Sequence, residues 1–107
     1  MSVSIIIKRI VKNEKTAIKL SPFIVQLRSH AATQPGFLNS QTFSCLDCKG
    51  EYLVISNWNT LEDWNRRMNS EERMGIQKDV DELLGEKTIY RYYEPVVGGI
   101  SPRFIKN

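Results

Sequence analysis

The chain has 107 residues and a formal net charge of +3, and 41% of its residues are hydrophobic. This length allows one domain rather than two, with the composition of an ordinary globular protein. Basic residues alternate with acidic ones along the chain, whereas nucleic-acid binders gather them on one face, so nucleic acid is excluded as a partner. No apolar run approaches the ~20 residues of a membrane span, which excludes a membrane protein.

The first predicted element is a strand over residues 2–11, because "SVSIIIKRIV" is rich in β-branched residues. Its charges follow the apolar run, which is the reverse of a secretion signal, so we expect a cytoplasmic protein. Residues 13–36 then carry the apolar stripe of an amphipathic helix, formed by Ala17, Leu20, Ile24, Leu27 and Ala31. Pro22 predicts either a kink or a helix that begins there, with Ser21 as its cap.

Two strands are predicted next, over 37–45 and 51–58, and "LDCKG" between them is typical of a hairpin connection. A short helix follows within 59–68, capped by Thr60. A second helical piece begins after Ser70 and ends at Gly85. Its buried stripe is expected to consist of Ile76, Val80, Leu83 and Leu84. The last strand is predicted over 87–95.

This order of elements indicates an α+β fold of the ferredoxin-like βαββαβ type, with one antiparallel sheet and the helices on one face. We expect a single domain over 1–107, with its core in 3–95 and a C-terminal tail in 96–107. The strands are apolar on both faces, and a monomer would leave one of these faces to water. We therefore expect a homodimer packed sheet against sheet, with Ile100 and Phe104 of the tail wrapping the partner.

Cys45 and Cys48 form a Cys-x-x-Cys motif inside the hairpin. A redox pair of this kind sits at a helix N-terminus, which lowers the thiol pKa, and no helix follows here. Two cysteines cannot fill a tetrahedral zinc site within one chain, although two chains could if their hairpin tips met. Two interpretations stay open. The motif is either an incidental feature of the turn without a function, or a surface disulfide or redox-sensitive turn.

The stretch "EYLVISNWNTLEDWNRRMNSEERM" resembles the signature of the antibiotic biosynthesis monooxygenase family. In that family a strand ends in Trp, a Thr or Ser caps a short helix, a second Trp follows, and the helix restarts at a Ser-rich step. "LRSHAATQPGFLNSQTF" resembles its first helix, turn and second strand. The resemblance covers nearly all of residues 3–95 and implies a dimeric α+β barrel, with a pocket between helices and sheet.

Members of the family with known activity oxidise quinols or polycyclic phenols with O₂, without metal or flavin, and many members have no known substrate. The resemblance therefore implies a monooxygenase that oxidises a small aromatic quinol or phenol, with O₂ as co-substrate and no cofactor. The alternative is a non-catalytic dimeric module of the same fold that binds a small ligand or serves a stress response.

Two tryptophans and two tyrosines are candidates for the ligand-binding wall. Trp64 matches the helix tryptophan of the family, which implies a catalytic position and a pocket wall; the alternative is a core residue that anchors a short helix. Trp58, at a strand end, is assigned to substrate binding, with a core aromatic as the alternative. Tyr90 and Tyr92 share a strand face and are assigned to substrate binding, with cross-strand packing as the alternative.

Three further residues complete the candidate set. Asn57 is a catalytic candidate because its amide could hydrogen-bond a substrate oxygen, although asparagines are common at strand ends. His30, the single histidine, is a candidate base, with a role at a helix C-terminus as the alternative. Met74 is assigned to substrate binding, with a helix methionine that faces the core as the alternative.

One branch of the family cleaves haem, and its pattern can be compared with this sequence directly. That branch has an Asn before an Arg on its first strand, and an axial His ten residues after the helix Trp. Here Lys8 and Arg9 form the strand pair, and Met74 stands at the position of the axial His. The sequence therefore disfavours haem binding and haem degradation.

Overall fold

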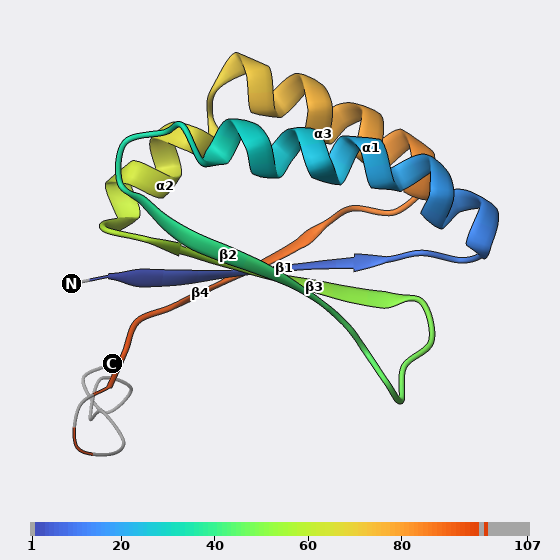
Figure 1. Ribbon diagram of the computed structural model, residues 1–107, viewed down its shortest axis with the longest axis horizontal. Coiled ribbons are helices and arrows are strands. Elements are labelled where there is room, and N and C mark those ends of the chain that lie inside the picture. Colours follow the sequence, from blue (N-terminus) through green and yellow to red (C-terminus); the bar gives the residue numbers. More distant parts are fainter. Residues whose placement is uncertain (1, 97, 99–107) are drawn as a thin grey trace.

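The computed structural model describes residues 2–96 and 98. Its elements follow the predicted order (Figure 1), namely β1 (Val3–Ile10), α1 (Glu14–Ala31), β2 (Phe37–Ser44), β3 (Glu51–Trp58), α2 (Leu61–Met68), α3 (Glu71–Leu84) and β4 (Ile89–Tyr93). This confirms the ferredoxin-like α+β fold. The part of the tail with Ile100 and Phe104 lies outside the described residues, so its contact with a partner stays a prediction.

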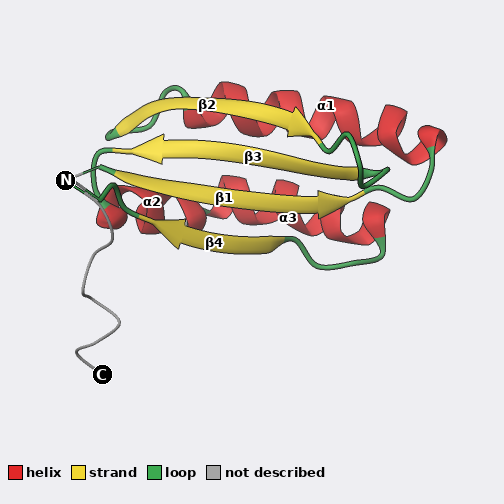
Figure 2. Ribbon diagram, turned by 90° about the horizontal axis from the view of Figure 1, so that it is seen from below, coloured by secondary structure: helices red, strands yellow, loops and turns green. Residues whose placement is uncertain are grey.

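The four strands form one antiparallel sheet in the order β2-β3-β1-β4. All three helices lie on one face of this sheet, and among the described residues no element covers the opposite, bare face (Figure 2). Alternation along β1 turns Ile5 and Ile7 towards the helices and Ile6 towards the bare face. The prediction that β1 is apolar on both faces is therefore confirmed.

Helix α1 begins well before Pro22, where one of the two predictions placed its start. Asn13 is its N-cap and accepts a hydrogen bond from the backbone N–H of Thr16 at 2.8 Å. The helix continues through Pro22, so the prediction that it begins at Pro22 with Ser21 as its cap is wrong. Pro22 is exposed, which places the hydrogen bond lost to proline on the solvent side, while the apolar stripe continues on the other side.

The other helix caps agree with the sequence. The hydroxyl of Thr60 accepts from the N–H of Asp63, and that of Ser70 from the N–H of Arg73. Gly85 ends α3 with a φ of 70°, in the left-handed region that glycine tolerates. Strand β4 is shorter than the predicted 87–95, and the hydroxyl of Thr88, just before it, hydrogen-bonds side chains of α3.

Two apolar clusters form the core between the helices and the sheet. One, near α2, consists of Ile5, Ile7, Val54, Trp58 and Trp64. The other, between α1 and α3, consists of Val11, Leu20, Leu27, Val80 and Leu84. Within the described residues, every helix is too short or too polar to cross a membrane.

Candidate active site

Two adjoining cavities lie between α1 and the sheet, where the two core clusters meet. The smaller has a volume of about 40 Å³, and both tryptophans contribute to its wall. The larger has a volume of about 200 Å³ and is lined mainly by aliphatic side chains of α1 and β3 and by Val11, which follows β1. Arg9, Ile24 and Val54 line both cavities. The two therefore form one candidate site, with Arg9 at the junction.

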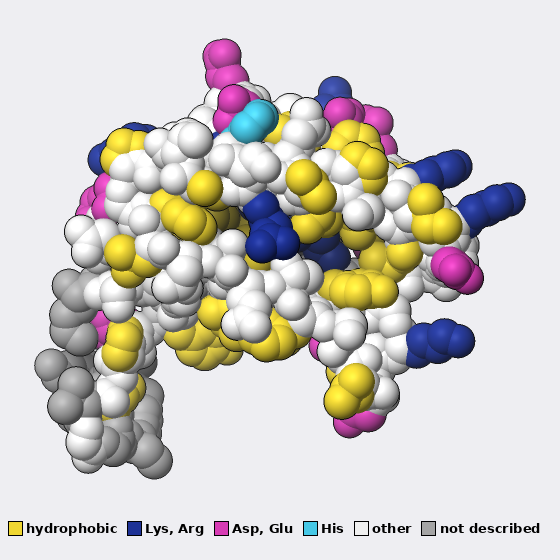
Figure 3. Space-filling view, in the orientation of Figure 1, with side chains coloured by type: hydrophobic (Ala, Val, Ile, Leu, Met, Phe, Trp, Pro, Cys, Tyr) yellow, Lys and Arg dark blue, Asp and Glu magenta, His cyan; other side chains and the backbone are white. Residues whose placement is uncertain are grey.

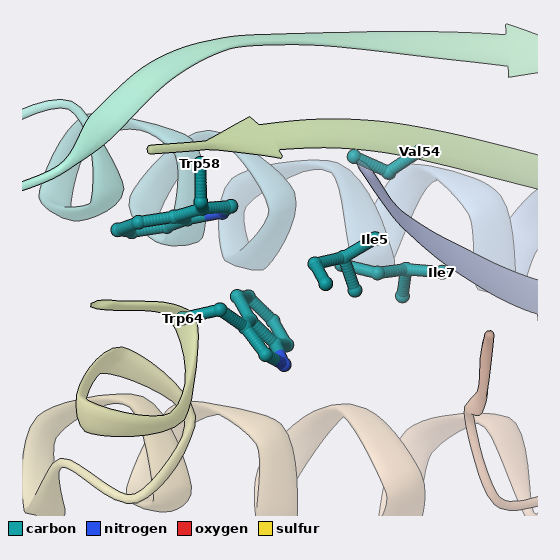
Figure 4. Packing of buried hydrophobic residues seen from close by; sticks show 5 residues of the cluster. All are labelled: Ile5, Ile7, Val54, Trp58 and Trp64. Carbon is teal, nitrogen blue, oxygen red and sulfur yellow. The ribbon is translucent and has the colours of Figure 1, made fainter. Parts of the chain in front are cut away.

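Trp58 and Trp64 form an aromatic wall of the smaller cavity, and Figure 4 shows the two side chains next to each other. The rings of Trp58 and Trp64 meet edge to face, with centroids 5.8 Å apart, and Tyr90 lies 6.1 Å from Trp64. The indole N–H of Trp58 donates to the hydroxyl of Ser56 at 2.8 Å. The indole N–H of Trp64, which is only 2% exposed, has no hydrogen-bond partner among the described residues. The aromatic wall can therefore stack against a flat ligand, and the indole N–H of Trp64 can donate a hydrogen bond to it.

Three buried arginines line the smaller cavity as well, namely Arg9, Arg67 and Arg73. Their exposed fractions are only 4%, 2% and 4%. Arginine is seldom buried to this degree unless it is paired with an acid. The three come from different elements, β1, α2 and α3. The walls of the cavity are therefore apolar, but its electrostatic character is strongly positive.

Neutral groups provide most of the partners of these guanidinium groups. Arg9 donates to the side-chain oxygen of Gln77 at 3.0 Å. Arg73 donates to the Tyr90 hydroxyl at 3.0 Å and lies over the Trp64 ring, 5.0 Å from its centroid. Neither arginine has a carboxylate within 4.0 Å in the described part of the chain.

Arg67 is the exception, since it contacts Glu72 at 3.2 Å and also donates to the carbonyl of Leu27 at 3.2 Å. Glu72 is half exposed, so this ion pair reaches the surface. Burial lowers the pKa of Arg67, and the charge of Arg73 lowers it further. Burial likewise lowers the pKa of Arg9 to about 10; the charge of Arg73 adds to this shift, whereas Tyr90 and Asp81 oppose it. With a pKa of about 10, Arg9 remains charged at neutral pH.

In the sequence these arginines count among basic residues spread along the chain, although their spacing carries a signal. Arg9 continues the inward-facing alternation of Ile5 and Ile7 on β1. Arg67 follows Trp64 by three residues, and Arg73 precedes Val80 by seven, so both lie on the buried helix stripes.

Of the predicted binding residues, the structure brings Trp58, Trp64 and Tyr90 together. Tyr92 lies on the same sheet face but is 50% exposed, and its hydroxyl reaches the sulfur of Met68 at 3.6 Å, at the rim of the cluster. Met74 is 56% exposed and lines neither cavity, so its interpretation as a core methionine is wrong.

The two polar candidates lie away from the cavities. Strand alternation turns Ser56 and Trp58 inward and therefore turns Asn57 to the bare face, where its amide bonds Ser4 and Asn39. His30, near the end of α1, lies 3.0 Å from the carboxylate of Glu72 and lines neither cavity. The structure therefore does not place Asn57 or His30 where a ligand in these cavities would meet them.

The cysteine pair lies in the hairpin between β2 and β3, at a distance from any helix N-terminus. Both cysteines are free thiols, and the Cys45 thiol donates to the carboxylate of Asp47 at 3.1 Å. This hydrogen bond, supported by Cys48, raises the pKa of Cys45 to about 11. Cys45, Cys48 and Glu51 have ligand atoms within 4.8 Å of one another, but Glu51 also pairs with Lys8 at 3.4 Å.

We expect Cys45 to react slowly with iodoacetamide at neutral pH, because the thiolate is the nucleophile and little of it forms below the raised pKa. The rate should rise with pH until it passes the folded pKa of about 11. Mass spectrometry of timed digests can follow alkylation at each cysteine. Asp47→Asn removes the carboxylate and should accelerate alkylation of Cys45; an unchanged rate in that variant would contradict the assigned cause.

The comparisons with known proteins agree with this architecture. The model of the family described as "Antibiotic biosynthesis monooxygenase" matches residues 4–78. A mutant of SnoaB, a cofactor-independent oxygenase from Streptomyces nogalater, superposes with a TM-score of 0.76 at 14% identity, over 92% of this chain and 98% of that one. A conserved protein from Methanosarcina mazei Go1 gives a TM-score of 0.81 at 14% identity, over 90% and 94% of the two chains.

A further solved structure, described as an antibiotic biosynthesis monooxygenase, gives a TM-score of 0.75 at 16% identity and covers 88% of this chain and 98% of its own. At these identities the similarity to solved structures shows the fold. No curated protein sequence matches the chain.

Proposed function

Because this chain belongs to the antibiotic biosynthesis monooxygenase family, we propose that it is a cofactor-independent monooxygenase that oxidises a small phenol or quinol with O₂. The observation that carries the proposal is the pair of adjoining cavities, with tryptophan walls and buried cationic donors. An apolar site with a few placed polar groups is the usual form of a small-molecule pocket. The name of SnoaB as a cofactor-independent oxygenase supports chemistry without a cofactor.

In the proposed reaction the substrate itself supplies the electrons. A phenolate or quinol anion passes one electron to O₂, and the resulting ring radical and superoxide combine to a peroxide. The peroxide then takes up a proton and loses water. For a quinol the product is a hydroxyquinone, so one oxygen atom enters the ring, the other leaves as water, and no external reductant is consumed. The protein binds the ring, stabilises the anion and keeps water from the radical pair.

The donors beside the aromatic wall favour an oxygenase over a purely non-catalytic module. Arg73 lies over the ring of Trp64, and the hydroxyl of Ser56 is held next to Trp58. A phenolic oxygen in the smaller cavity would therefore have donors within reach. Neither cavity is lined by Asp, Glu or His among the described residues, so we propose that the arginines, rather than a side-chain base, favour the loss of the phenolic proton.

We also propose that the bare sheet face packs against a second copy of the chain. Ile6 lies opposite Ile55 at the centre of this face. Around this pair the face continues with Leu53 and with Phe43 and Ile89, which are 41% and 44% exposed. Apolar surface of this extent is unusual in a monomer. Sedimentation at micromolar concentration checks the proposal, and a monomer throughout would contradict it.

Oxygen-electrode measurements with a panel of hydroquinones and anthrones test the proposed activity. We expect protein-dependent O₂ uptake above the autoxidation of each substrate, unaffected by a metal chelator. Heat-denatured protein provides the background. Trp64→Phe, which shortens the wall but keeps it apolar, should lower kcat/KM. If the whole panel gives no uptake although some of its members bind, the non-catalytic binding module would be the better description.

A further inference from the structure

We infer that the two cavities bind a single aromatic ring that carries an anionic oxygen, either a phenolate or a carboxylate, with the anionic group held by the three buried arginines. This inference names the substrate class of the site and rests on the proposed function only for the assignment of that site as the reaction pocket. Its physical basis is the charge, the unpaired donors and the size of the cavities.

The first argument is the excess of buried positive charge. Arg9, Arg67 and Arg73 line one cavity, and in the described part of the chain only Arg67 has a carboxylate partner. Burying a guanidinium without a counter-charge is costly. Arg73 lowers the pKa of both other arginines, so the three act on one another as well. An anion in the cavity would offset the cost of desolvating the guanidinium groups and would weaken the repulsion between them.

The second argument is a set of buried donors without acceptors. The Nε atoms of Arg9 and Arg67 and the indole nitrogen of Trp64 have no hydrogen-bond partner in the described part of the chain. About 90% or more of buried polar groups in proteins have such a partner. All three residues line the smaller cavity. Only an acceptor can satisfy them, and an anionic oxygen accepts the strongest hydrogen bonds from a guanidinium.

The third argument is the space for a ring beside these donors. The larger cavity, of about 200 Å³, is bounded by Val11, Leu20 and Ile24 and has Arg9 at its inner end. A cavity of about 150 Å³ can hold benzene. Figure 3 shows basic side chains in the hollow on this side of the molecule, with hydrophobic side chains around them. The ring would occupy the larger cavity and direct its anionic oxygen past Arg9 towards the smaller one.

This arrangement has a chemical consequence for a phenol. Cations around the oxygen favour the phenolate and therefore lower the pKa of the bound phenol. The electron-rich form that reacts with O₂ would then be present at neutral pH, although neither cavity is lined by a histidine or a carboxylate among the described residues.

Ligand titrations test the inference without turnover. Benzoate and benzamide share one shape but differ in charge, and the two tryptophans of the chain both line the smaller cavity, so their fluorescence reports binding. We expect benzoate to bind at least about tenfold more tightly than benzamide, which corresponds to about 1.4 kcal/mol. A second probe, 4-nitrophenol, distinguishes the phenolate, since its absorbance spectrum should shift to that of the anion on binding at a pH below its own pKa.

Matched arginine variants locate the effect. Arg9→Met should abolish the preference for benzoate, whereas Arg66→Met, which removes an exposed charge from α2, should leave it unchanged. Circular dichroism confirms that each variant is folded. Equal affinities for benzoate and benzamide together with an unshifted 4-nitrophenol spectrum would overturn the inference, as would an equal loss in the two variants.

The outcomes separate this inference from the proposed function. If benzoate is preferred and no substrate consumes O₂, the anion site stands and the oxygenase proposal fails. If O₂ uptake occurs with neutral quinols and no anion is preferred, the oxygenase proposal stands and the anion site is wrong.

Discussion

Replacing Trp64 by alanine is expected to lower the free energy of unfolding by about 3–5 kcal/mol, the usual cost of truncating a buried tryptophan. Its side chain is only 2% exposed. It packs edge to face on Trp58 and lies under the guanidinium of Arg73. The truncation therefore leaves a cavity in the core and removes the ring that stabilises a buried cation.

Urea unfolding followed by circular dichroism measures this effect. Leu61→Ala is the matched control, because Leu61 lies in the same helix but is 41% exposed, and its loss should cost less than about 1 kcal/mol. Trp64→Phe should fall between the two. If Trp64→Ala and Leu61→Ala were equally stable, Trp64 could not be the anchor of α2 that the packing indicates.

Replacing Arg9 by methionine is expected to stabilise the protein. Without ligand, the free energy of unfolding should rise by roughly 1–3 kcal/mol. Burial lowers the pKa of Arg9 from the usual arginine value to about 10, so the unfolded chain holds this proton more tightly than the folded one. The cost of burying this charge is therefore fully present at every pH below about 10 and fades only as the pH rises from there towards the usual pKa of arginine. Methionine fills similar space without the charge.

The same unfolding measurement across the neutral pH range checks this prediction. The gain in the free energy of unfolding should be independent of pH in this range, because Arg9 is protonated in both the folded and the unfolded chain. Arg66→Met should change stability by less than about 0.5 kcal/mol, since exposed ion pairs contribute little. A loss of stability in Arg9→Met would mean that the guanidinium is already well paired, and it would weaken the inference of an anion site.

The sequence predicted the fold well, because that fold rests on local patterns. Alternation in β1, the caps Thr60 and Ser70, and the stop at Gly85 all act within a few residues and are present in the structure. The helix through Pro22 was harder to predict, since a proline on the solvent side of a helix is tolerated when the opposite side is packed. That packing depends on contacts with α3, which are distant in sequence.

The candidate site was predicted only in part. Trp58, Trp64 and Tyr90 were identified by residue type and spacing, and the structure brings them together. Asn57 was chosen for its chemistry although its position on β3 turns it to the bare face. The arginines were missed for the converse reason, because their charge suggested the surface although their spacing is that of buried residues. Spacing identified inward-facing positions better than chemical type did.

The central claim, that this protein inserts one oxygen atom of O₂ into a small phenol or quinol, is tested most directly with isotopically labelled O₂. The purified protein would be incubated with a monocyclic hydroquinone in the presence of a metal chelator, and the product analysed by mass spectrometry. We expect a hydroxyquinone that carries one labelled oxygen atom, with the other recovered in water. An unlabelled quinone accompanied by hydrogen peroxide, or no consumption beyond autoxidation, would contradict it.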